Sequence, residues 1–218
     1  RYYPTLSGVA RSLNYYPIGE EKAEEGVVSL ALGLGKYIVD GGLTLRVCPY
    51  HPNKVLQTSE LELALRETQT QFYALDTKNI GENFSVDDGF NILKLPVKEA
   101  EADGALTYIA STYDPYDMVI RDGIYPGGRK VLQHDVFPLA DILRLTQQYG
   151  QGEMRRPVEI EFAANLNDDR TGTFYLLQIR PIVDCKKMLE EDLSTIPDED
   201  VIIRSNNSLG HGIMDEMQ

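Results

Sequence analysis

The stretch that most constrains the fold runs from Val158 to Val183 and reads VEIEFAANLNDDRTGTFYLLQIRPIV. Two runs of alternating apolar and polar residues flank a polar segment at positions 167–172. This pattern predicts two antiparallel strands joined by a loop of about six residues. If the loop is symmetric, Leu166 lies opposite Thr173, and this pairing fixes the register of the whole hairpin.

That register assigns the side chains to two faces. It pairs Glu161 with Gln178 and Glu159 with Arg180, and because side chains alternate along a strand, these four share one polar face. The carboxylate of Glu161 and the amide oxygen of Gln178 would lie on neighbouring strands, about 5 Å apart at Cβ, and could bind one Mg²⁺. Arg180 could hold a phosphate oxygen with its guanidinium group. The opposite face is apolar and should pack on the core: Ile160, Phe162, Leu177 and Ile179.

A plainer interpretation of the same pattern is an amphipathic hairpin with its polar face in solvent. Glu159 and Arg180 would then form only a weak cross-strand ion pair. The alternation by itself favours this second interpretation, since surface hairpins alternate in the same way.

The rest of the chain predicts an α+β fold with a mostly antiparallel sheet and helices on one side. Ser59 and Glu62 form a capping box, and the apolar spacing from Leu61 to Leu75 predicts an amphipathic helix of about four turns. A second helix should begin at Pro138 and end at Gly150. Further strands are predicted at 43–47, 90–95, 105–110, 118–120 and 129–133.

Composition excludes several classes of protein. The 218 residues carry 34 acidic and 21 basic side chains, a net charge of −13, so the basic footprint of a nucleic-acid-binding protein is absent. The sequence contains no apolar run long enough to cross a membrane. The two cysteines, Cys48 and Cys185, show neither a disulfide framework nor metal-ligand spacing, which fits a cytoplasmic protein.

Three segments resemble a known family. Glu159–Ala163 with Leu177–Pro181 is similar to the Asp-Ile-Glu-Trp-Ala and Leu-Gln-x-Arg-Pro segments of the ATP-grasp domain in phosphoenolpyruvate synthase and pyruvate phosphate dikinase. Ser7–Ala10 resembles the family's Ser-Gly-Val-Ala strand, and Leu32–Gly41 resembles its Gly-Leu-Gly-Glu-x-Val-Val-x-Gly segment. The three occur in the family's order. Lys36 stands where the family usually has Glu, and Phe162 stands where it has Trp.

The resemblance implies a site, a cofactor and a reaction. Glu161 and Gln178 would bind Mg²⁺ and ATP, and Arg180 would contact ATP and act as the catalytic residue at the transferred phosphate. Residues 1–185 would be the C-terminal lobe of an ATP-grasp domain, and 186–218 a loosely held tail or linker. The parent enzyme would transfer the β-phosphoryl group of ATP through a histidine to pyruvate.

The resemblance also implies partners outside this chain. We expect a fragment of a larger multidomain protein, because the chain starts at Arg1 without Met and ends without a terminating Gly or Pro. The remaining domains would be an N-terminal ATP-grasp lobe, a phosphohistidine domain and a pyruvate-binding barrel, with a homodimer as one assembly of the full-length enzyme. None of the histidines, His51, His134 and His211, lies in the family's carrier motif, so we expect the fragment alone to be inactive.

Two alternatives to that function stay open. One is a related dikinase or phosphotransferase with another acceptor, such as a glucan or an antibiotic. The other is a non-catalytic ATP-grasp relic used for binding or regulation, which Lys36 keeps in consideration.

Overall fold

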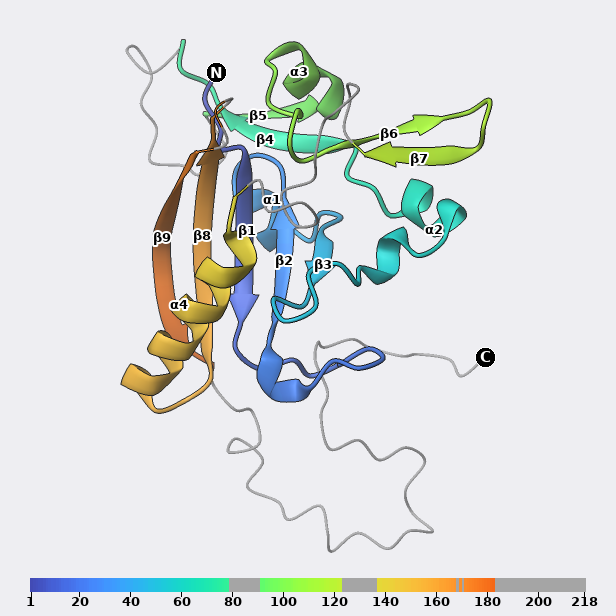
Figure 1. The fold of residues 1–218 in the computed structure, drawn as a ribbon. Coiled ribbons are helices and arrows are strands. Elements are labelled where there is room, and N and C mark those ends of the chain that lie inside the picture. Colours follow the sequence, from blue (N-terminus) through green and yellow to red (C-terminus); the bar gives the residue numbers. More distant parts are fainter. Residues whose placement is uncertain (79–90, 123–136, 168, 170, 183–218) are drawn as a thin grey trace, which may run out of the picture. The chain divides into compact units, whose positions relative to one another are not determined.

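Strands from the two ends of the described chain form its main sheet (Figure 1). The computed structural model describes residues 1–78, 91–122, 137–167, 169 and 171–182. Within these residues a five-stranded sheet has the order β3-β2-β1-β8-β9, with every neighbouring pair antiparallel. The strands are β1 (Leu6–Arg11), β2 (Val27–Ala31), β3 (Leu45–Val47), β8 (Val158–Leu166) and β9 (Gly172–Pro181). The predicted α+β class with a mainly antiparallel sheet is confirmed.

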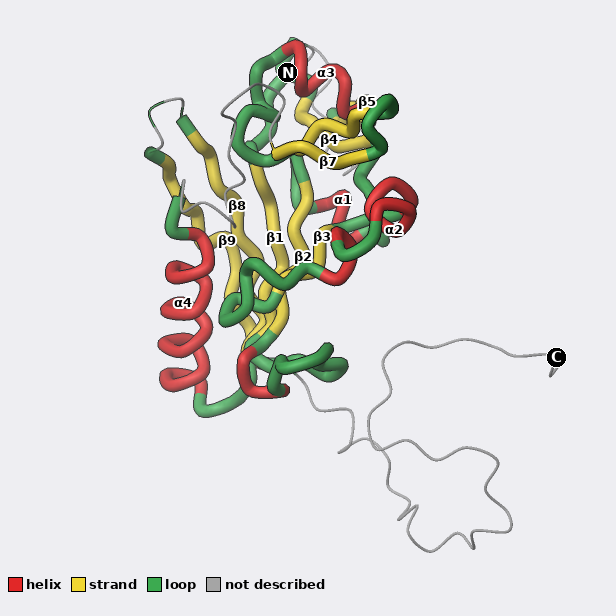
Figure 2. Tube along the Cα trace, turned by 45° about the vertical axis from the view of Figure 1, so that its right-hand side comes forward, coloured by secondary structure: helices red, strands yellow, loops and turns green. Residues whose placement is uncertain are grey.

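Helix α4 (Leu139–Met154) packs on one face of this sheet, as Figure 2 shows. Its buried Leu139 and Leu143 belong to the same apolar cluster as Ile160 and Phe162. The helix continues past Gly150, where the sequence predicted its end. Gly150 permits close packing of α4 on β9 and does not end the helix. A Cβ atom there would stand 2.4 Å from Cδ1 of Ile179. Arg155, in the left-handed region at φ 50°, ends the helix instead.

The remaining elements are short. Two further hairpins are β4 (Gln71–Leu75) with β5 (Ile92–Pro96) and β6 (Ser111–Asp114) with β7 (Val119–Asp122). The helices are α1 (Lys36–Val39), α2 (Leu61–Arg66) and α3 (Val97–Ala102), with 3₁₀ turns η1 (Ala23–Glu25) and η2 (Leu56–Thr58). A second apolar cluster joins β4 to α3 through Leu32, Phe72, Ala74, Ala100 and Leu106.

The prediction of one long helix from Ser59 to Leu75 is wrong. Helix α2 has only six residues, and Ser59 does not cap it, since its hydroxyl donates to the carbonyl of Leu56 at 2.7 Å. The side-chain amide of Gln69 instead pairs with the backbone N–H and C=O of Leu32, at 2.9 and 3.0 Å. This contact lays the chain beside β2, and Phe72 is then buried from a strand, so tertiary packing overrides the helical spacing.

The other predicted strands have mixed outcomes. Those at 43–47, 90–95 and 118–120 are confirmed as β3, β5 and β7, with ends shifted by a few residues. The strand predicted at 105–110 is wrong, because this segment forms a turn in which the carbonyl of Leu106 accepts from Ile109 and Ala110. The predicted strand at 129–133 and the predicted tail at 186–218 lie outside the described residues.

The hairpin has the predicted register at its site end and a different one toward its loop. Glu161 pairs with Gln178 and Glu159 with Arg180, as predicted. The register then shifts at a β-bulge next to Glu161, so that Leu166 pairs with Gly172 rather than with Thr173. Leu177 is the extra residue of this bulge and is 63% exposed, so its predicted burial is wrong. Phe162 is buried and Ile179 partly buried, as predicted.

Replacing Gly8 with alanine should destabilise the domain by about 1–3 kcal/mol. A Cβ atom at Gly8 would stand 2.2 Å from Cζ of the Phe162 ring, which is buried and stacked on Phe174 and so has little room to move. Urea denaturation of the 218-residue chain measures the change. Gly152→Ala is the control, because nothing lies within 4 Å of the added atom in α4 and a small gain in stability is expected. Equal stability of the Gly8→Ala chain and the wild type would contradict this packing.

Candidate functional site

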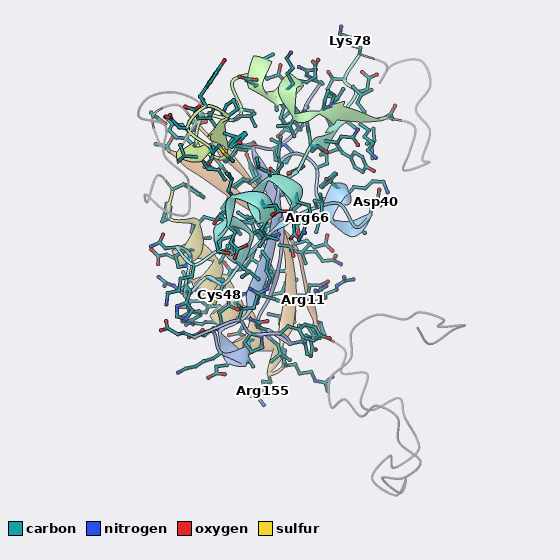
Figure 3. All side chains as sticks on the ribbon, turned by 90° about the vertical axis from the view of Figure 1, so that its right-hand side faces the viewer. Arg11, Asp40, Cys48, Arg66, Lys78 and Arg155 are labelled. Carbon is teal, nitrogen blue, oxygen red and sulfur yellow. The ribbon has the colours of Figure 1, made fainter. Side chains whose placement is uncertain are left out.

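The face of the sheet opposite α4 carries the predicted site residues. Ile160 and Phe162 face the apolar cluster under α4, so Glu159 and Glu161, which alternate with them on β8, lie on the other face. Their partners across the hairpin, Gln178 and Arg180, share that face. Strand β1 adds Arg11, which pairs with Glu159 in the sheet and, in Figure 3, extends away from α4.

Glu159 holds two arginines on this face. Its Oε2 accepts from Nε of Arg11 at 2.6 Å, and its Oε1 accepts from Nε of Arg180 at 2.9 Å and also from Nη2 of Arg180. Burial acts to raise the pKa of Glu159, but the hydrogen bonds from Arg180 and Arg11 outweigh it, so the pKa is lowered. Glu159 in turn raises the pKa of Arg180. This carboxylate therefore stays ionised and orients the guanidinium group of Arg180.

Glu161 lies in a different environment two residues further along β8. Its side chain is one-third exposed (33%), and its ion pair with Nη2 of Arg180 is long, at 4.0 Å. Its neighbour Gln178 is exposed at the edge strand β9. The carboxylate of Glu161 can therefore bind a cation together with the amide oxygen of Gln178. The carboxylate of Glu159 is less suited to this, because both of its oxygens accept hydrogen bonds from arginines.

The glycine segment that resembles the family reaches the same face of the sheet. Ser7, which pairs with Ala163 on β8, donates its hydroxyl to the carbonyl of Gly33 at 2.7 Å. Gly33 has a φ of +88°, and a Cβ atom there would meet the carbonyl oxygen of Tyr73 at 2.6 Å, so only glycine fits this turn. Helix α1 then begins at Lys36, whose Nζ pairs with Asp40 at 3.1 Å. The structure thus brings all three resembling segments together.

Arg180 projects from the face of the sheet opposite α4, called the open face below, and 56% of its side chain is exposed. Two cavities in the described part of the chain lie elsewhere. One, of about 330 Å³, lies beside His51 and Lys54, and the other, of about 800 Å³, is lined mainly by apolar side chains such as Leu30 and Leu106. Neither of these two cavities is lined by Glu161, Gln178 or Arg180, so within the described residues the predicted site lies on a face of the sheet rather than in either cavity.

The chain matches a known protein family. The family described as pyruvate phosphate dikinase, AMP/ATP-binding domain, matches residues 2–200. The chain belongs to this family. Its mainly antiparallel sheet with few helices fits an ATP-grasp-like domain. The chain is thus a nucleotide-binding part of a dikinase-like enzyme. No curated protein matches the chain. None of the helices in the described residues is long and apolar enough to span a membrane.

Sequence reasoning missed two groups of residues. It paired Glu159 with Arg180 but did not include Arg11, because the register between β1 and β8 joins residues far apart in the chain. It also found no metal-ligand spacing around Cys48, whereas the structure brings Cys48, His51 and Glu25 together. The Cys-x-x-His spacing of residues 48–51 was a signal that could have indicated this cluster.

The ion pairs of Glu159 should give the domain an acid-dependent stability. Because the folded-state pKa of Glu159 is lowered, its contribution is fully present above its unfolded pKa of about 4.3 and is lost as the pH falls through the folded-state value. At pH 7 we expect the Glu159→Gln chain to be less stable than the wild type by about 1–2 kcal/mol. Urea denaturation from pH 7 to pH 3 should show this gap closing below pH 4. A gap that is constant over this range would contradict the lowered pKa.

Proposed function

We propose that this chain is the nucleotide-binding part of a phosphoenolpyruvate synthase-like enzyme that transfers the β-phosphoryl group of ATP through a histidine to pyruvate. The observation that carries the proposal is the register of the β8–β9 hairpin, which places Glu161 opposite Gln178 with Arg180 on the same open face. In this proposal Glu161 and Gln178 bind Mg²⁺ and ATP, and Arg180 contacts the phosphate that is transferred.

The donor set suits magnesium. Mg²⁺ prefers oxygen ligands and takes one or two from the protein, leaving its other positions to phosphate oxygens and water. Glu161 offers a carboxylate whose ion pair within the described residues is long, at 4.0 Å, and Gln178 offers an amide oxygen at the paired position. When bound, the ion would neutralise phosphate charge and orient the triphosphate.

The chain's own residues would act mainly by position and charge. The guanidinium group of Arg180 can donate two parallel hydrogen bonds to phosphate oxygens and so stabilise the charge that develops on them. Glu159 orients this group through its hydrogen bond to Nε. Because Arg180 is held before the substrate arrives, less ordering is needed when the reaction begins.

Nucleotide binding by the 218-residue chain tests the proposal. We expect Mg·ATP to bind weakly, with a dissociation constant no tighter than roughly the high micromolar range, because one sheet face supplies only part of the contacts of a nucleotide site. Isothermal titration calorimetry with Mg²⁺, and again with excess EDTA, should show binding only when Mg²⁺ is present. Nanomolar affinity would mean that the chain forms a complete site. Binding that does not depend on Mg²⁺ would contradict the assignment of Glu161 and Gln178.

A second candidate function, a non-catalytic ATP-grasp relic, rests on Lys36. This residue replaces the family's usual Glu at the start of α1 and forms an ion pair with Asp40. A relic would bind nucleotide without supporting phosphoryl transfer in the protein that carries this domain. Exchange of labelled phosphate between ATP and its products by that protein separates the two functions, since only the enzyme catalyses exchange.

A further inference from the structure

Three side chains with metal-binding atoms meet at the end of the sheet away from the glycine segment. Oε2 of Glu25, in η1, lies 3.1 Å from Nε2 of His51 and 3.9 Å from Sγ of Cys48, which directly follows β3. All three ligand atoms lie within 4.8 Å of one another. Cys48 is fully buried, and the side chains of Glu25 and His51 are 16% and 23% exposed. The cluster is therefore enclosed but can be reached from the side of His51.

The backbone holds these side chains in place. The N–H of His51 donates to the carbonyl of Cys48 at 3.0 Å, which closes a turn with Pro49 at its second position. The carboxylate of Glu25 is fixed separately, because its Oε2 accepts from the backbone N–H of Lys22 at 2.9 Å. The turn therefore fixes the backbone of Cys48 and His51, and the hydrogen bond from Lys22 fixes the carboxylate of Glu25.

We propose that Glu25, Cys48 and His51 form a binding site for one Zn²⁺ ion, separate from the nucleotide site. Zinc is bound tetrahedrally by sulfur at about 2.3 Å and by nitrogen or oxygen at about 2.0–2.2 Å, which implies roughly 3.4 Å between N and O ligands and 3.6 Å between S and O ligands. The observed separations of 3.1 and 3.9 Å differ from these by only a few tenths of an ångström.

The choice of metal follows from the ligands. Thiolate and imidazole select zinc over Mg²⁺ or Ca²⁺, which prefer oxygen. Binding would replace the thiol proton of Cys48 and release it to solvent, so that the ion is held by one thiolate, one neutral imidazole and one carboxylate. Complete burial of the sulfur argues against a nucleophilic cysteine, because a substrate could not reach it.

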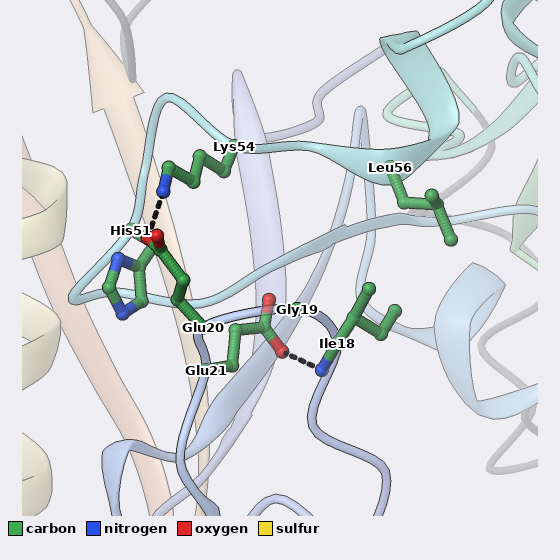
Figure 4. A pocket seen from close by; sticks show the side chains of 7 residues that line it. All are labelled: Ile18, Gly19, Glu20, Glu21, His51, Lys54 and Leu56. Atoms are coloured by element: carbon green, nitrogen blue, oxygen red, sulfur yellow. Dashed lines mark hydrogen bonds and ion pairs between the residues drawn. The ribbon is translucent and has the colours of Figure 1, made fainter.

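A cavity beside His51 gives the ion an entry path. It has a volume of about 330 Å³ and is lined by His51 together with Glu20, Glu21 and Lys54 (Figure 4). Lys54 forms an ion pair with Glu20 at the exposed side of this cavity. With three protein ligands, the fourth position of the tetrahedron would hold a water molecule. The ion would tie η1 to the segment after β3.

Cobalt titration of the 218-residue chain tests the site. Co²⁺ replaces Zn²⁺ in tetrahedral sites and gives a near-ultraviolet charge-transfer band only when a thiolate binds it. With excess Mg²⁺ to occupy oxygen-ligand sites and a phosphine as the reductant, we expect this band to saturate at one ion per wild-type chain. Added Zn²⁺ should abolish the band and raise the melting temperature.

Variants locate the metal and decide the outcome. Cys185→Ser removes the only other thiol and should retain the band at full intensity, whereas Cys48→Ser should abolish it. His51→Gln should weaken affinity by more than the roughly 10–100-fold that loss of an outer-shell partner costs. If the buried Cys48→Ser variant does not fold, the partly exposed His51→Gln variant still decides. No band in the wild type, a band lost in Cys185→Ser, or wild-type affinity in His51→Gln would overturn the proposal.

Discussion

Replacing Arg180 with alanine in the enzyme that contains this domain should slow the ATP half-reaction by about 10²–10³-fold. This is the usual cost of removing one donor that stabilises charge developing in the transition state. The domain should remain folded, because the Arg180 side chain is 56% exposed and leaves no cavity when it is truncated. Single-turnover formation of the phosphorylated enzyme from Mg·ATP measures the rate, and circular dichroism confirms the fold.

Arg11→Ala is the matched control for this experiment. Arg11 and Arg180 both pair with Glu159, so each variant removes one arginine and one ion pair from the same carboxylate. If Arg180 served only to neutralise Glu159, the two variants would slow the reaction equally. We expect Arg11→Ala to cost less than about tenfold and Arg180→Lys to stay well below the wild type, because lysine lacks the planar fork of arginine. Equal rates for Arg11→Ala and Arg180→Ala would remove Arg180 from the catalytic assignment.

The pairing of Glu161 with Gln178 could be predicted from the sequence for a simple reason. Polar and apolar residues alternate at 158–162 and 177–180, which allows few registers there, and a slip of one residue would place Gln178 on the opposite face from Glu161. The prediction failed at Leu177 and in the pairing toward the loop, because a bulge inserts one residue into β9 next to Glu161. A bulge and a one-residue change in loop length look the same in sequence, so the position of Leu166 opposite Gly172 was not predictable.

The helix predicted through Phe72 failed for another reason. Its spacing suits a helix and, over positions 72–74, also suits a strand with two buried side chains. The choice between them depends on Gln69, whose side chain binds the backbone of Leu32, 37 residues away. The Glu25–Cys48–His51 cluster is non-local in the same way, because Glu25 comes from a separate turn. Sequence patterns show which residues share a strand face, but not which distant segment lies against it.

Replacing Glu161 with glutamine should have the second large effect, and it should appear in the magnesium dependence. We expect the Mg²⁺ concentration for half-maximal ATP half-reaction to rise by at least about tenfold, since the neutral amide loses the charge attraction that holds a hard cation. The measurement is the initial rate at saturating ATP over a range of free Mg²⁺. Saturating Mg²⁺ should recover part of the lost rate, because glutamine still offers an oxygen ligand.

Glu159→Gln is the control, because Glu159 and Glu161 lie on the same strand and the same face but have different partners. Glu159 is buried and bound by two arginines, whereas Glu161 is one-third exposed and, among the described residues, has a long ion pair at 4.0 Å. Loss of Glu159 should therefore lower stability and loosen Arg180, which reduces the rate at every Mg²⁺ concentration without moving the half-maximal point. If Glu159→Gln raised the Mg²⁺ requirement and Glu161→Gln did not, the metal would bind at Glu159 rather than at Glu161. An equal rise in both would mean that the cation responds to the overall charge of this face, and that the pairing of Glu161 with Gln178 does not define its site.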